Sequence, residues 1–88
     1  MTNFTKGERA IARKLGVTPF GLWVLTQASV RGDYVRGGMA GPALEAKGYL
    51  APVRRIVTTK TGGTYDYPAR TITEAGRVLV ARARALGW

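Results

Sequence analysis

The sequence predicts a small α+β domain with three to four helices and a two- to three-stranded β-hairpin. Three observations carry this prediction: a helix pattern that stops at Gly48, β-branched runs on both sides of Lys60–Thr64, and a helix start at Thr73. A chain of 88 residues is expected to form one domain. Its expected parts are an N-terminal helix (1–16), a helical core (17–50), a hairpin (51–72) and a C-terminal helix (73–88).

The first helix is expected to begin after Thr5, because Thr5 and Glu8 have the spacing of a capping box. Gly16 provides a left-handed stop. The helical period separates an apolar side from a basic side. The apolar side holds Ile11 and Leu15, and the basic side holds Lys6, Arg9 and Arg13.

The second helix is expected to have Thr18 as its N-cap and Pro19 in its first turn. Apolar side chains cover most of its circumference, which is typical of a buried central helix. The side chains expected in the core are Phe20, Leu22, Trp23, Val24, Leu25 and Ala28.

The third helix is expected from about Met39 to Lys47, because Pro42 is tolerated only in a first turn. Gly48 should end it. Before it, residues 31–38 predict a turn and a short extended piece over Asp33–Arg36.

The hairpin is expected from strands at Val53–Thr59 and Thr64–Ile72, in which β-branched residues are frequent. Thr61–Gly63 should form its tip, since glycine adopts the positive φ angles that tight turns need. Pro68 predicts an edge position or a bulge after Tyr67.

The last helix is expected to start at Thr73 and to face the core with Ala75, Leu79, Ala83 and Leu86. Arg77 and Arg84 fall on the opposite side. Val80 is expected to point outward, and Trp88 to be an exposed aromatic. These two residues predict a weak homodimer interface.

The composition argues against an enzyme and against cofactors. The chain contains no Cys and no His, and its 5 acidic residues are scattered, so neither a zinc site nor an acid–base pair is expected. A chain without Cys suits a reducing cytoplasm, which is the expected location. The longest apolar stretch, Leu15–Val30, is interrupted by polar residues, glycine and proline, so no membrane contact is expected.

The charge points to a polyanionic partner. The sequence has 14 Lys and Arg residues and a formal net charge of +9. Such a balance favours DNA, RNA or an anionic surface. The alternative is that the charges only keep the protein in solution.

Residues Val17–Leu86 resemble winged-helix regulators of the MarR and PadR kind. Ala43–Leu50 is similar to the end of their recognition helix, and Thr71–Arg77 to the strand end and capped helix after their wing. The chain departs from these regulators between Arg31 and Gly37, which is too short for their usual intervening helix. Separately, Ile11–Pro19 looks like the centre of a helix-turn-helix.

The resemblance implies a protein that binds double-stranded DNA, as a small transcriptional regulator or as an accessory protein of a phage or other mobile element. Two alternatives remain: a protein–protein module, such as a phage-type inhibitor of a nucleoprotein enzyme, and RNA binding through the basic side of the first helix. The expected nucleic-acid-binding residues are Arg36, Lys47, Arg54, Arg55, Lys60, Thr61, Gly62, Gly63 and Thr64.

Overall fold

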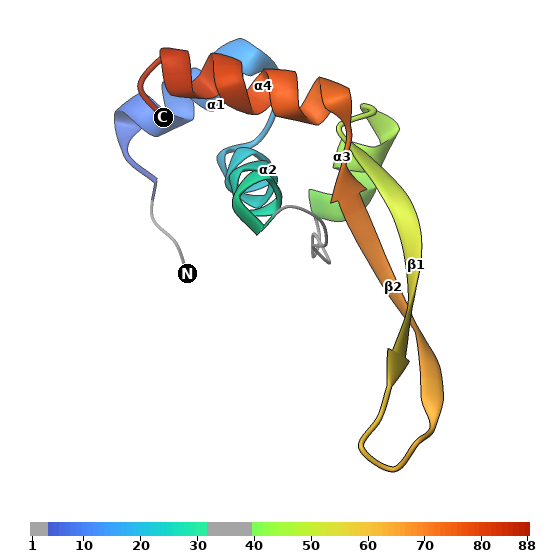
Figure 1. The fold of residues 1–88 in the computed structure, drawn as a ribbon. Coiled ribbons are helices and arrows are strands. Elements are labelled where there is room, and N and C mark those ends of the chain that lie inside the picture. The colour runs from blue at the N-terminus through green and yellow to red at the C-terminus, as the bar shows by residue number, and fades with distance from the viewer. Residues whose placement is uncertain (1–3, 32–39) are drawn as a thin grey trace.

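The computed structural model describes residues 4–31 and 40–88, and in this part of the chain the fold is α+β, as predicted. The expected extended piece at Asp33–Arg36 and the expected helix start at Met39 lie outside these residues. The elements in chain order are α1 (Lys6–Leu15), α2 (Pro19–Arg31), α3 (Gly41–Ala46), β1 (Leu50–Thr58), β2 (Thr64–Ile72) and α4 (Glu74–Ala85) (Figure 1).

Helix α1 has both predicted ends. The Glu8 backbone N–H donates to Thr5 Oγ1 at 3.1 Å, and Glu8 Oε1 accepts from the Thr5 N–H at 2.8 Å, which confirms the capping box. Gly16 ends the helix with a φ of 76°. Leu15 is buried and Ile11 packs against the core, whereas Lys6, Arg9 and Arg13 are exposed.

Helix α2 begins as predicted, because Thr18 Oγ1 accepts a hydrogen bond from the Gly21 N–H at 2.9 Å. Most of its apolar side chains are in the core, namely Leu22, Val24, Leu25 and Ala28. The prediction was wrong for Phe20 and Trp23, which are 43% and 38% exposed. Their rings stack on each other, with centroids 5.9 Å apart. A domain of this size has too few elements to cover a central helix on every side.

Helix α3 is shorter than predicted and runs from Gly41 to Ala46. Pro42 lies in its first turn, as expected. The helix ends at the C-cap Lys47, and Gly48 follows with a φ of 82°, so the predicted glycine stop is confirmed one residue beyond the cap. Leu44 anchors this short helix to the core.

Strands β1 and β2 pair antiparallel without interruption from Leu50 opposite Ile72 to Thr58 opposite Thr64. Strand β1 therefore starts earlier than the predicted Val53. Pro68 pairs opposite Arg54 within this register, so the alternative of a bulge was wrong. The predicted edge position of Pro68 is confirmed, since each strand of a two-stranded sheet has a free edge that tolerates proline.

Helix α4 has Thr73 as its N-cap, as predicted, with Thr73 Oγ1 accepting from the Gly76 N–H at 3.1 Å. The predicted phase of its buried side was wrong in part. Leu79 and Ala83 are buried, but Ala75 is exposed and Leu86 is 40% exposed.

Val80, expected to point outward, is only 3% exposed. Helix α4 packs against α1, α2 and β2 together, which buries a sector centred between Leu79 and Val80. Trp88 is half-buried against the core and lies beside Phe4, with ring centroids 6.1 Å apart. The expectation that Val80 points outward is therefore wrong, and Trp88 is less exposed than expected. The weak homodimer itself stays a prediction.

The helices and the hairpin occupy opposite ends of an elongated molecule. Helices α1 and α4 lie side by side over α2, and the hairpin extends away from them (Figure 1). The principal extents are 48 × 27 × 20 Å. Among the described residues, the core is formed mainly by Ala12, Leu22, Leu25, Leu44, Leu79 and Val80, and it includes Leu50 and Ile72 at the base of the hairpin.

Candidate nucleic-acid interface

The hairpin tip, Thr59–Gly63, is closed by its own hydrogen bonds. The Thr59 N–H donates to the Gly63 carbonyl at 2.7 Å, and the Gly62 N–H donates to the Thr59 carbonyl at 3.0 Å. Thr59 Oγ1 also accepts from the Gly63 N–H at 3.1 Å. Thr59 was not among the predicted site residues, yet its side chain and backbone organise the tip.

Five predicted site residues lie together at this tip, and all five are exposed: Lys60, Thr61, Gly62, Gly63 and Thr64. Gly62 has a φ of 86°, and a Cβ at this position would meet no atom within 4 Å. Lys60 is exposed at this tip, which lies at the end of the hairpin far from the helices (Figure 1). The N–H groups of Gly62 and Gly63 already donate within the tip. The group at the tip that is suited to a phosphate is therefore the Lys60 ammonium group.

The remaining predicted residues do not join this cluster. Arg54 and Arg55 are paired opposite Pro68 and Tyr67 in the middle of the hairpin, and their side chains are outside the described part of the structure. Arg36 is also outside the described residues.

Lys47 lies on the helical body and not at the hairpin tip. Its ammonium group donates a hydrogen bond to the Gly16 carbonyl, at the end of α1. This contact joins the end of α3 to the end of α1 and satisfies one of the carbonyls that a helix C-terminus leaves without a partner. The structure thus gives Lys47 a role in the fold.

Arg70, which the sequence did not single out, fixes the base of the hairpin. Its Nε donates to Glu45 Oε1, so an ion pair joins β2 to α3. The guanidinium also lies over Gly41, where a Cβ would be 2.6 Å from Arg70 Cζ. A side chain at position 41 would therefore have to displace the Arg70 guanidinium.

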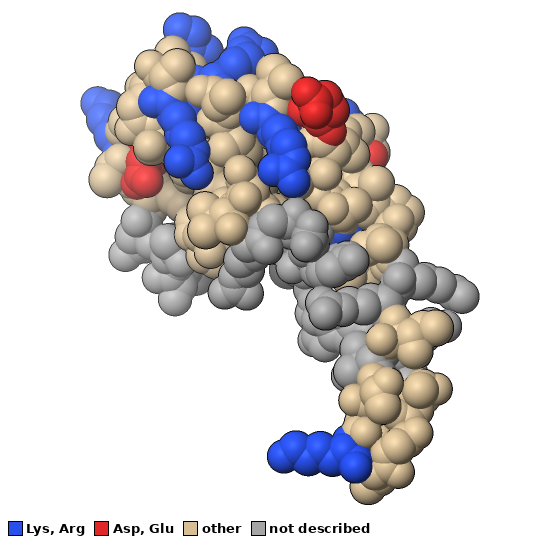
Figure 2. Space-filling model, viewed as in Figure 1, with Lys and Arg blue, Asp and Glu red and all other residues tan. Residues whose placement is uncertain are grey.

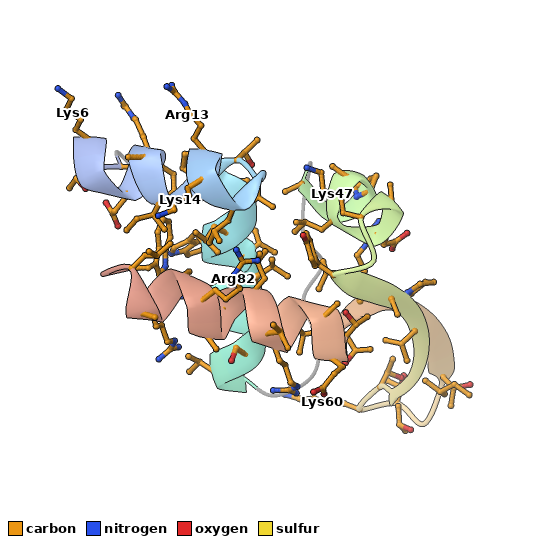
Figure 3. All side chains as sticks on the ribbon, turned by 90° about the horizontal axis from the view of Figure 1, so that it is seen from above. Lys6, Arg13, Lys14, Lys47, Lys60 and Arg82 are labelled. Atoms are coloured by element: carbon orange, nitrogen blue, oxygen red, sulfur yellow. The ribbon has the colours of Figure 1, made fainter. Side chains whose placement is uncertain are left out.

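A second basic region lies on the helical end. The sequence predicted the basic side of α1 but not that α4 adds basic residues beside it. We define the α1–α4 surface by seven exposed basic residues of these two helices: Lys6, Arg9, Arg13, Lys14, Arg77, Arg82 and Arg84. Figure 2 shows Lys and Arg side chains spread over this end of the molecule. In Figure 3, Lys6 and Arg13 point away from α4, and Lys14 and Arg82 lie over the seam between the helices.

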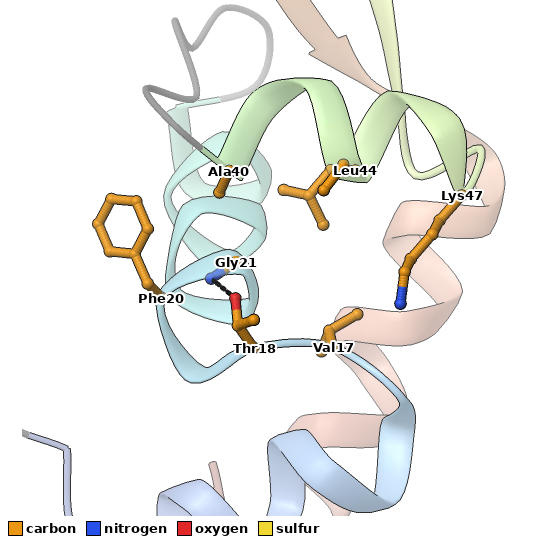
Figure 4. A pocket seen from close by; sticks show the side chains of 8 residues that line it. Val17, Thr18, Phe20, Gly21, Ala40, Leu44 and Lys47 are labelled. Atoms are coloured by element: carbon orange, nitrogen blue, oxygen red, sulfur yellow. Dashed lines mark hydrogen bonds between the residues drawn. The ribbon is translucent and has the colours of Figure 1, made fainter.

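An apolar pocket of about 350 Å³ lies between the start of α2 and α3 (Figure 4). Phe20 stands at its edge (Figure 4), and its ring stacks on that of Trp23. The lining residues are Val17, Thr18, Phe20, Gly21, Ala40, Ala43, Leu44 and Lys47.

Comparisons with protein-family models, with curated proteins and with solved structures find no match to this chain. Among residues 4–31 and 40–88, no group of three or more acidic, His or Cys residues is placed to hold a metal ion. Within the same ranges, no helix has the length and apolar character needed to cross a membrane.

Proposed function

We propose that the protein binds double-stranded DNA, mainly through phosphates, and that the β1–β2 hairpin is the wing of a small winged-helix domain. The observation that carries this proposal is the position of Lys60 on an exposed tip, at the end of a hairpin that extends away from the helices. A net charge of +9 supports a polyanionic partner.

Helix α3 offers little for reading bases. Its exposed positions include Pro42, Ala43 and Ala46, none of which carries a hydrogen-bonding side chain. Discrimination between base pairs in the major groove relies on paired donors and acceptors, such as those of Arg, Asn or Gln. We therefore expect weak sequence preference, and a role as a small regulator or mobile-element accessory protein that binds near other specific factors.

The wing is tested by Lys60→Ala, with Lys60→Arg as a charge-preserving control. Loss of one phosphate contact should weaken binding to two unrelated duplexes by similar factors and reduce the log–log salt slope by about 1. Lys60→Arg should bind like the parent. Fluorescence anisotropy at several salt concentrations measures both quantities. If Lys60→Ala binds like the parent at every salt concentration, the wing does not contact DNA.

One observation favours a second candidate, a module that docks on a protein. Phe20 and Trp23 form an exposed stacked pair at the edge of an apolar pocket, and exposed apolar patches often mark interaction sites. This candidate predicts that the parent associates with a host protein and does not bind duplex DNA. It also predicts that Phe20→Asp abolishes the association with the host protein. DNA binding that is unchanged in Phe20→Asp supports the first proposal.

A further inference from the structure

We propose that the α1–α4 surface is a second binding site for duplex DNA, so that one molecule holds two DNA segments together. The inference rests on the proposed DNA binding by the wing. It adds a second interface at the opposite end of the molecule.

The α1–α4 surface has an excess of basic over acidic residues. The α1–α4 surface has seven exposed basic residues, whereas the acidic residues of the two helices are Glu8 and Glu74. Glu8 is occupied at the start of α1, where its carboxylate accepts the Thr5 N–H. Glu74 lies in the first turn of α4, where a carboxylate stabilises the helix end. Basic residues of the two helices thus outnumber their acidic residues seven to two.

Three basic residues of α1 are spaced so that they lie in a row. Lys6, Arg9 and Arg13 follow one another at intervals of three and four residues, which places them in a row on one side of α1. The row extends for about 10 Å along the helix axis. One strand of B-DNA carries about one charge per 3.4 Å of helix axis. The row is therefore long enough to contact more than one phosphate of a strand.

The row of basic residues on α1 is separated from the tip of the wing. Nine residue pairs make the hairpin about 30 Å long, and its tip lies at one end of a molecule 48 Å in extent. Lys6 and Arg13 point away from Lys60 as seen from above, and the hairpin extends away from α1 in the perpendicular view (Figures 1 and 3).

Because Lys6 and Arg13 point away from Lys60 in Figure 3, a single duplex that contacts both Lys60 and the row on α1 has to bend around the protein. DNA has a persistence length of about 150 bp, and bending a site of 20–30 bp around the protein costs about 1–6 kcal/mol. Two separate duplexes meet both surfaces without that cost. A monomer with two such sites bridges DNA.

The test is co-capture by the full chain at low salt. One duplex is immobilised on beads, and a second duplex of unrelated sequence carries a fluorophore. The parent should capture the fluorescent duplex on the beads. The captured amount should be largest at an intermediate protein concentration, because excess protein saturates the two duplexes with separate molecules. Sedimentation at the same concentrations should show a monomer.

Two variants separate the surfaces. Lys60→Ala removes the tip charge, and a triple variant with Lys6→Gln, Arg9→Gln and Arg13→Gln neutralises the row. Both variants are compared with the parent at protein concentrations that saturate a single duplex in anisotropy. Each variant should capture about tenfold less fluorescent duplex than the parent. The reason is that each variant keeps one DNA site and loses phosphate contacts at the other. The control replaces the row by Lys6→Arg, Arg9→Lys and Arg13→Lys, which keeps its charge and should keep co-capture.

The changed side chains are exposed, and circular dichroism with thermal unfolding verifies the fold of each variant. Should the triple variant unfold, Lys14→Gln with Arg82→Gln tests the same surface from its centre. The inference is overturned if the parent binds single duplexes without co-capture, or if co-capture persists in both variants, as a self-associating protein would show. Absence of binding to any single duplex is a different result, because it refutes the proposed function itself.

Discussion

Gly76 lies where the start of α4 crosses the end of β2, and the crossing leaves no room for a side chain. A Cβ at this position would be 2.7 Å from Ile72 Cγ1 and still closer to the Tyr49 carbonyl oxygen. The Tyr49 carbonyl oxygen also accepts a hydrogen bond from the Thr73 N–H at 3.1 Å. The carbonyl group therefore cannot move away without breaking that hydrogen bond. The position of α4 on the hairpin therefore depends on this glycine.

We expect Gly76→Ala to lower the free energy of unfolding by about 1–3 kcal/mol, because the added methyl group overpacks the crossing. Gly7→Ala is the matched control. Gly7 is also helical, but a Cβ there would have only Thr5 Oγ1 within 4 Å, at 3.9 Å. That change should stabilise the protein by about 0.5–1 kcal/mol. Urea unfolding measures both, and similar changes in both variants would contradict the close packing.

Thr73 joins the same crossing through its hydroxyl group, which donates to the Gly48 carbonyl at 2.6 Å and accepts the Gly76 N–H at 3.1 Å. Thr73→Ala should cost about 1–2 kcal/mol, since both the cap and the link to the end of α3 are lost. Thr73→Ser keeps the hydroxyl and should retain most of the stability. An alanine variant as stable as the serine variant would show that these hydrogen bonds contribute little.

At the scale of the elements, local signals in the sequence predicted where helices begin and end, because caps and glycine stops act within a few residues. The capping box of Thr5 and the stop at Gly16 are examples. The buried side of each helix was less predictable, since it depends on which neighbours cover it. Val80 is buried because α4 meets three elements at once, whereas Trp23 stacks on Phe20 and is 38% exposed.

The candidate site shows the same division. The five tip residues from Lys60 to Thr64 were predictable together because they are consecutive in the chain. Lys47 was assigned to the same site, but its hydrogen bond to Gly16, 31 residues away, could not be read from the sequence. The basic side of α1 was predictable from the helical period, whereas its position beside α4 depends on how two helices distant in sequence pack.

Lys47 and Lys60 should therefore respond in opposite ways to loss of charge. Lys47→Met should lower the free energy of unfolding by about 0.5–1.5 kcal/mol through the lost hydrogen bond. It should leave the salt slope of DNA binding unchanged. Lys60→Met should reduce DNA affinity at unchanged stability. Thermal unfolding and anisotropy of both variants decide between the roles, and a Lys47 variant that loses affinity without losing stability would make Lys47 a phosphate contact.

At the scale of the whole molecule, a core shared by the helices and the base of the hairpin supports a hairpin that extends away from the helices. The ion pair of Arg70 with Glu45 and the crossing at Gly76 hold the base of that hairpin against α3 and α4. Basic side chains occur at both ends of the 48 Å long axis. A polyanion can thus be contacted at the tip, at the helices, or at both.

The central claim, binding to duplex DNA through phosphates, is tested most directly by the salt dependence of affinity. The measurement is the Kd of the full chain for a labelled duplex of arbitrary sequence at several salt concentrations. Contact with about four to six phosphates predicts that the logarithm of affinity falls against the logarithm of salt concentration with a slope of about −4 to −5. A second, unrelated duplex should give the same slope. Absence of binding at the lowest salt concentration, or binding that does not change with salt, would contradict the account.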